Sequence, residues 1–207
     1  MKSKMESLIK LSGIIIILIF IILYKFKMPK SALDYWDLIL ESAGYSVIPI
    51  AIYERYLWKY NPFVKMPRLK KKYTGVLSYN YKGKSGEKVV EIEIKQSFLS
   101  TDVKLKSDEI SSKTITSDLV EENGEFVLYY TYITNPLSRY SEKNPIQIGT
   151  CKLLIDKIDS IKGSYWTNRK TIGDLTLESE EERDRASSPS PCSYKFRIFC
   201  LSCKVHQ

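Results

Sequence analysis

Histidine is almost absent from this sequence: the 207 residues contain one, His206, beside the C-terminal residue. A catalytic triad with an imidazole base, or a histidine-rich metal site, therefore cannot be built in the body of the chain. The sequence also has no glycine-rich phosphate loop, no metal-ligand cluster and no nucleophile motif. We therefore predict a protein that is not an enzyme, with no catalytic residues, no resident cofactor and no metal ion.

Cysteine is scarce before the last sixteen residues, where three of the four cysteines lie. The body of the chain holds only Cys151, which is typical of a small buried apolar residue rather than of a disulfide framework. Cys200 and Cys203 with His206 look like half of a zinc site, which lacks a fourth ligand unless Cys192 joins it. This cysteine usage indicates a reducing compartment.

Positive charge and tyrosine are abundant instead. The net charge is +8, and the chain contains 15 tyrosines. A basic protein favours an anionic partner, either phospholipid headgroups or a nucleotide. The charge alone leaves the choice between these two partners open.

A long apolar run lies near the N-terminus. No charged residue occurs from Leu11 to Tyr24, and Lys10 and Lys25 at the ends of this run can reach lipid headgroups. A spanning helix needs ~17–25 residues, and neighbouring apolar residues extend the run to about that length. A signal peptide has a similar core, but no small-x-small cleavage site follows the run. We predict a membrane-spanning helix over about residues 8–26.

A second, weaker candidate runs from Leu38 to Trp58. Its uncharged core, Ser42–Tyr53, is short, although Gly44 and Pro49 are common in membrane helices. Aromatic residues bracket the segment as they do at membrane interfaces: Tyr35, Trp36, Tyr53, Tyr56 and Trp58. An interfacial or soluble helix is the alternative. We predict a two-helix transmembrane hairpin, with the second helix at about residues 38–58.

Basic residues are densest directly after this second segment: Arg55, Lys59, Lys65, Arg68, Lys70, Lys71 and Lys72. Positive charge next to a spanning helix stays on the cytosolic side of the membrane. We therefore expect a multi-pass protein with both termini, and everything after the hairpin, in the cytosol.

From Tyr73 to Leu177 the pattern changes to an alternation of apolar and polar residues, which is typical of strands with one buried face. The clearest runs are Val89–Ile94, Val103–Leu105, Phe126–Ile133, Cys151–Ile155 and Leu175–Leu177. Turn signals separate them at Lys82–Gly86, Glu122–Gly124 and Asn135–Pro136. About eight short strands joined by tight turns predict an all-β domain that forms an antiparallel up-and-down barrel, with a sandwich as the alternative. An eight-stranded barrel can enclose one small ligand.

These patterns divide the chain into three parts. Residues 1–59 hold the two predicted transmembrane helices, and residues 60–178 form the predicted cytosolic barrel. Residues 179–207 are first acidic and then rich in serine and proline, a composition typical of a disordered linker. We expect this tail to be irregular.

Three stretches carry a family resemblance. The first has Leu57-Trp58, Asn61-Pro62, Pro67 and Gly75, although Lys71 and Tyr73 stand where the family has Gly and Trp. The second is Leu128–Pro136. The third has the spacing Gly-x-Tyr-x-Thr-x-Arg-x-Thr-x-Gly at Gly163, Tyr165, Thr167, Arg169, Thr171 and Gly173. Together they resemble the SMODS-associating two-transmembrane, β-strand-rich effectors of CBASS, the cyclic-oligonucleotide antiphage signalling system.

The resemblance implies a lipocalin-like barrel on the cytosolic side of the bacterial inner membrane. It implies that this barrel binds a cyclic oligonucleotide, most simply a cyclic dinucleotide, made by a partner nucleotidyltransferase. Binding would promote self-association, and the hairpins would then disrupt the membrane and abort the infection. Whether the nucleotide activates or silences the effector stays open. The partners implied are the nucleotide, membrane lipids and further copies of the chain, with no DNA or RNA polymer.

A cyclic dinucleotide offers two bases and two phosphodiesters, so its pocket needs aromatic faces, a fixed cation and hydroxyl groups. Strand alternation places Tyr165, Thr167 and Arg169 on one face, and Tyr130 and Tyr132 on another. Arg169 is the main candidate for a phosphate contact, because a guanidinium can grip two oxygens at once. The predicted ligand-binding residues are Tyr130, Tyr132, Tyr165, Thr167, Arg169, Thr171 and Gln96.

Two other functions remain open. A membrane-tethered barrel that binds a lipid would have a pocket lined by aliphatic residues. A scaffold barrel would bind a protein partner and no nucleotide. Each candidate residue also has a purely structural alternative, since paired tyrosines commonly fill a barrel core and Arg169 lies near a predicted turn.

Overall fold

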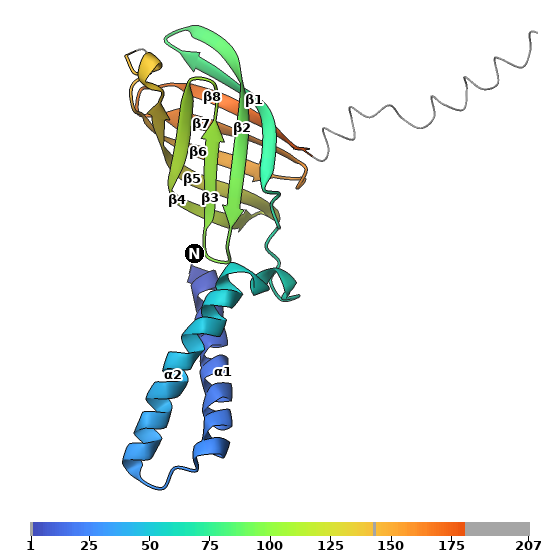
Figure 1. Ribbon diagram of the computed structural model, residues 1–207. Helices are drawn as coiled ribbons and strands as arrows, with labels where there is room; N and C mark the ends of the chain where they lie inside the picture. The colour runs from blue at the N-terminus through green and yellow to red at the C-terminus, as the bar shows by residue number, and fades with distance from the viewer. Residues whose placement is uncertain (1, 143, 181–207) are drawn as a thin grey trace, which may run out of the picture.

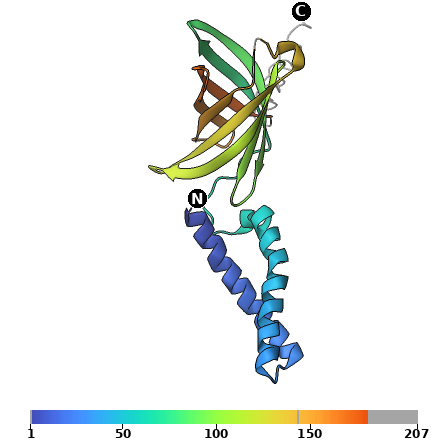
Figure 2. The same cartoon turned by 90° about the vertical axis from the view of Figure 1, so that its left-hand side faces the viewer.

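The computed structural model describes residues 2–142 and 144–180, and consists of a helical hairpin joined to a β-barrel (Figure 1). Helices α1 (Lys2–Lys27) and α2 (Ala32–Arg55) lie side by side and extend away from one end of the barrel (Figures 1 and 2). The sequence placed the second helix at about 38–58, whereas α2 begins six residues earlier. The reason is a capping box, in which Ser31 and Asp34 satisfy each other's backbone N–H groups. The cysteines and the histidine of the predicted tail lie outside the described residues.

One helix among the described residues is long and apolar enough to cross a membrane, over Lys4–Lys27 with a mean hydropathy of 2.6. Helix α2 does not meet this criterion. It carries acidic residues at Asp34, Asp37 and Glu41, yet it also leaves Trp36, Ile39, Leu40, Val47 and Ile48 exposed. By composition, therefore, α1 is the candidate membrane span, whereas α2 has only exposed apolar side chains to suggest such a role.

Eight antiparallel strands form a closed barrel in chain order, with β8 pairing back onto β1. The strands are β1 (Lys72–Tyr81), β2 (Lys84–Gln96), β3 (Thr101–Lys106), β4 (Ile110–Glu122), β5 (Glu125–Pro136), β6 (Ile148–Ile155), β7 (Ser160–Thr167) and β8 (Ile172–Ser179). The predicted eight-stranded barrel is thereby confirmed, and the sandwich alternative is wrong. None of the clear alternating runs in the sequence corresponds to β4, which is rich in serine and threonine and lacks a clear apolar face.

The barrel interior is filled by the alternate residues that point inward. Tyr73, Leu128, Leu153, Ile161 and Leu177 are fully buried and come from five different strands. Outward-facing residues such as Glu91 remain solvated. A closed sheet with one apolar face explains why the sequence alternates with period two.

The ladder between β3 and β4 is nearly broken. Lys106 and Ser111 are their one backbone pair, and on its other side β4 shifts its register with β5 between Thr114 and Thr116. The Thr114 hydroxyl takes over from the missing ladder: it accepts from Val103 N at 2.9 Å and donates to Val103 O at 2.8 Å. The barrel therefore closes at this seam through side chains.

A small aromatic cluster joins the hairpin to the barrel. Phe98, in the β2–β3 turn, donates its backbone N–H to Glu54 O of α2 at 2.9 Å. Its ring lies 5.8 Å from that of Tyr53 and 6.4 Å from that of Trp58, which belongs to the short helix η1 (Leu57–Tyr60). Trp58 and Phe98 are both buried. These contacts fix which end of the barrel faces the helices.

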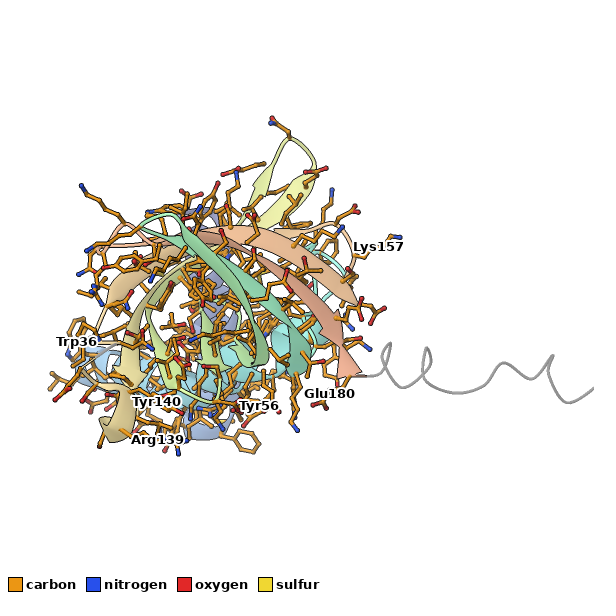
Figure 3. All side chains as sticks on the ribbon, turned by 90° about the horizontal axis from the view of Figure 1, so that it is seen from above. Trp36, Tyr56, Arg139, Tyr140, Lys157 and Glu180 are labelled. Atoms are coloured by element: carbon orange, nitrogen blue, oxygen red, sulfur yellow. The ribbon has the colours of Figure 1, made fainter. Side chains whose placement is uncertain are left out.

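Because the strands run alternately up and down, the turns that follow β2, β4 and β6 lie at the same end as the helices, which we call the helix-proximal end. The turns β1–β2, β3–β4, β5–β6 and β7–β8 lie at the opposite, helix-distal end, where the β5–β6 connection includes the short helix η2 (Ser138–Tyr140; Figure 1). Viewed from above, Arg139 and Tyr140 of η2 lie on the opposite side of the barrel from Lys157 (Figure 3). The helix-distal end is the one that carries the candidate site.

Candidate functional site

A cavity of about 530 Å³ lies inside the helix-distal half of the barrel. Small-molecule sites commonly have volumes of about 300–1,000 Å³. Its floor is apolar and includes Leu77, Leu105 and Leu175, whereas its wall and rim carry tyrosines, hydroxyls and charged groups. An apolar floor with a polar rim suits a ligand that has both ring faces and charges.

Five tyrosines line the cavity: Tyr79, Tyr81, Tyr130, Tyr132 and Tyr165. The rings of Tyr130 and Tyr132 lie 5.8 Å apart on β5, and both side chains are buried. Cys151 on β6 is the cross-strand neighbour of Tyr130 on β5 and of Tyr165 on β7, so these two rings lie on either side of β6. The cavity therefore offers several aromatic faces, which are what nucleobases stack on.

Close packing of this wall depends on Gly149. A Cβ atom there would lie 2.5 Å from the ring of Tyr132, so only glycine leaves room for that ring.

Burial, reinforced by the neighbouring Cys151, raises the pKa of the hydroxyls of Tyr130, Tyr132 and Tyr165 above its ordinary value. These hydroxyls therefore stay protonated and can donate hydrogen bonds to a ligand.

Arg169 is held over the rim of the cavity by Tyr81. Its Nη2 donates to the Tyr81 hydroxyl at 3.1 Å, and its Cζ lies 5.3 Å from the centre of the same ring. The Thr167 hydroxyl accepts from Arg169 N at 3.3 Å and from Thr171 N at 3.4 Å, which orders the β7–β8 turn. A guanidinium fixed in this way has remaining donors for an anionic ligand.

Two lysines and one carboxylate complete the charged rim. Lys88 donates to Glu109 Oε2 at 2.5 Å, and its Nζ lies 5.6 Å from the ring centre of Tyr79. Asn144 Nδ2 donates to the same oxygen at 2.7 Å. Lys84 also lines the cavity. Three cations against one carboxylate leave the described rim net positive.

The structure brings six of the seven predicted ligand-binding residues to this one cavity: Tyr130, Tyr132, Tyr165, Thr167, Arg169 and Thr171. Gln96, which the sequence analysis grouped with them, lies outside this cavity. It is the last residue of β2, at the helix-proximal end, and its side chain accepts from Leu69 N and donates to Pro67 O, both at 2.9 Å. The Gln96 amide therefore anchors the segment that enters β1.

Several cavity residues were not anticipated from the sequence: Tyr79, Tyr81, Lys84, Lys88, Glu109, Asn144 and Gln147. The alternation of Leu77, Tyr79 and Tyr81 along β1 is a signal that could have identified the two tyrosines. Glu109 and Asn144 carry no such signal, because they come from different turns that meet only in the folded barrel. No group of three or more metal-ligating side chains occurs within residues 2–142 and 144–180.

The fold and this cavity define a class of protein: a small closed barrel, joined to an apolar helix, with an internal cavity whose rim is net positive. Residues 64–179 match the family described as Cap15, cyclic dinucleotide receptor domain. A CD-NTase-associated protein 15 from Staphylococcus schleiferi is 39% identical over 181 residues, which cover 86% of this chain and 98% of that protein. The chain belongs to the Cap15 family.

Proposed function

We propose that this chain is a membrane-anchored effector of CBASS antiphage defence, whose barrel binds a cyclic dinucleotide made by a partner nucleotidyltransferase. The observation that carries the proposal is the cavity itself. Tyrosine faces suited to two bases and three cations suited to two phosphodiesters line one space of about 530 Å³. The family description and the name of the relative concern the same ligand and the same kind of partner.

The second part of the proposal concerns the helices. We infer that α1 and α2 both lie in the bacterial inner membrane, with the barrel and both chain ends in the cytosol. Helix α1 supplies a span with a mean hydropathy of 2.6, and α2 exposes Trp36, Leu40 and Ile48 to the surroundings. Ligand binding leads to self-association of the hairpins and to membrane disruption, which aborts the infection.

Binding of an uncharged lipid is the weaker alternative, because it gives the rim cations no role. A lipid pocket would be lined by aliphatic side chains, whereas this cavity carries Lys84, Lys88 and Arg169 beside five tyrosines. Burying cations around an uncharged chain costs free energy that an anionic ligand offsets.

The test is calorimetry on the full chain in detergent micelles, with cyclic di- and trinucleotides and with linear dinucleotides of the same bases. We expect tight binding of at least one cyclic dinucleotide and much weaker binding of its linear counterpart, which lacks the closed ring. The effector step is tested by dye release from vesicles that hold the full chain, with and without that ligand. A folded protein that binds none of these nucleotides would leave the lipid and scaffold functions as the better explanations.

A further inference from the structure

The rim of the cavity contains a carboxylate, although an anionic ligand is attracted by cations alone. Glu109 lies in the turn between β3 and β4 and is the one acidic side chain among the described lining residues. A negative charge at this place weakens the attraction for phosphates, so it calls for a separate role.

The position of Glu109 is fixed by its neighbours. Its backbone O accepts from Leu137 N at 3.0 Å, which ties the turn to the β5–β6 connection. Its side chain is 30% exposed, and Oε2 accepts from both Lys88 and Asn144. Oε1 accepts no hydrogen bond from any residue that the structure describes. The carboxylate is thus held rigidly, with one oxygen left for a ligand.

A carboxylate is an acceptor only, so it recognises a group that presents donors. The Watson–Crick edge of guanine presents two adjacent donors, N1–H and the exocyclic amine. The same edge of adenine presents its amine beside an N1 acceptor, whose lone pair would face the carboxylate. A fixed, half-buried acceptor therefore discriminates between the two purines, in the way that polar sites reject a ligand lacking the matching group.

We propose that Glu109 reads a guanine base, and that the ligand of this chain is a guanine-containing cyclic dinucleotide. This inference rests on the proposed function, which it deepens by naming the base. Lys88 and Arg169 neutralise the phosphodiesters, while the tyrosine wall stacks against the bases. Lys88 also offsets the charge of Glu109, so that the acid can remain in the rim without repelling the ligand.

A positioning role is the rival explanation, in which Glu109 only holds Lys88 in place for a phosphate. The two roles predict different patterns. Loss of a base contact changes the preference among bases, whereas loss of Lys88 positioning weakens every cyclic dinucleotide equally, because all of them carry the same phosphodiesters.

The experiment compares cyclic di-GMP, cyclic di-AMP and cyclic di-IMP by calorimetry on the full chain in detergent micelles. Inosine keeps the N1–H of guanine and lacks its exocyclic amine, so it isolates one of the two donors. The variants are Glu109→Gln and, as a matched control, Glu125→Gln at the start of β5. The melting temperature of each variant confirms that it is folded.

We expect the unaltered chain to prefer cyclic di-GMP over cyclic di-AMP by on the order of 10- to 100-fold, with cyclic di-IMP between them. Glu109→Gln should reduce this ratio to near one, and Glu125→Gln should leave it unchanged. Equal or tighter binding of cyclic di-AMP to the unaltered chain overturns the inference. An equal loss for all three ligands in Glu109→Gln also overturns it and assigns the positioning role. A folded chain that binds no nucleotide at all overturns the proposed function, and the base assignment with it.

Discussion

Arg169 and Tyr81 meet across the helix-distal rim, where the guanidinium both stacks on the phenol ring and donates to its hydroxyl at 3.1 Å. Tyr81 ends β1 and Arg169 lies in the β7–β8 turn, so the contact links two turns on neighbouring strands. A long flexible side chain is thereby restricted to one region of the rim. This restriction reduces the entropy that a ligand must overcome to engage the guanidinium.

Removing this guanidinium should weaken the binding of a cyclic dinucleotide. We expect Arg169→Ala to lower affinity by on the order of 10- to 100-fold, since a charge-assisted hydrogen bond contributes about 1.5–3 kcal/mol. Tyr81→Phe should have a smaller effect, because it keeps the ring under the guanidinium and removes one hydrogen bond. Calorimetry with the tightest-binding nucleotide measures both changes. Arg139→Ala is the control, because Arg139 is exposed on η2 and does not line the cavity. Equal affinities of Arg169→Ala, Tyr81→Phe and Arg139→Ala would contradict the role of Arg169.

The seam between β3 and β4 makes a prediction about stability. Thr114→Val keeps the shape of the side chain but removes the hydroxyl that bonds both the N–H and the C=O of Val103. We expect the free energy of unfolding to fall by about 1–3 kcal/mol, because two backbone groups lose their partner. Urea denaturation measures the change. Thr116→Val, at an exposed position two residues away, should change stability by less than about 0.5 kcal/mol.

Alkaline pH should destabilise the barrel through Cys151. Burial raises the pKa of this thiol from its ordinary value of 9.0 to about 12. The folded chain therefore keeps a proton that the unfolded chain releases, and stability falls as the pH rises from about 9 toward about 12. One such proton accounts for at most about 1.4 kcal/mol per pH unit. The buried tyrosines act in the same direction at higher pH.

Urea denaturation at several pH values between about 8 and 10 measures this slope. Cys151→Ala has no thiol to titrate, so its stability should fall less steeply over the first part of this range, although it starts from a lower value because of the cavity created. Parallel curves for the two proteins would show that Cys151 does not account for the loss.

The fold could be predicted from the sequence because a closed barrel with one solvated face imposes period-two alternation on nearly every strand. β4 shows no such alternation, since serine and threonine occupy both of its faces. The Thr114 hydroxyl, rather than the β4 backbone, bonds to Val103 of β3. The alternation also identified which tyrosines share a face. It could therefore place Tyr130 with Tyr132, and Tyr165 with Thr167 and Arg169, but it could not show that these two groups line one cavity.

Alternation says nothing about which end of the barrel a residue occupies, and this explains why Gln96 was grouped with residues of the other end. The side chain lies at the helix-proximal end of β2, far along the strand from the turns that form the cavity rim. The rim residues Glu109 and Asn144 could not be grouped from the sequence, because 35 positions separate them and their hydrogen bond forms only after the barrel closes. Contacts between turns depend on closure, whereas the face of a strand depends on local sequence.

The aromatic cluster at the helix-proximal end should control how firmly the barrel is attached to the hairpin. Phe98 is buried between Tyr53 and Trp58, so Phe98→Ala removes the side chain that fills this junction while leaving the barrel strands intact. We expect faster amide hydrogen exchange in the segment from the end of α2 through η1, because local opening there loses its packing. The β5 and β6 amides should keep their protection, since they lie in the barrel core.

Leu99→Ala, at the next position of the same turn but only partly buried, should leave exchange at the junction nearly unchanged. If exchange in Phe98→Ala instead rose throughout the barrel, the cluster would be part of the barrel core, and the barrel and hairpin could not move independently. Exchange confined to the junction would mean that Phe98 and its two aromatic neighbours hold the hairpin to the barrel without contributing to the barrel core.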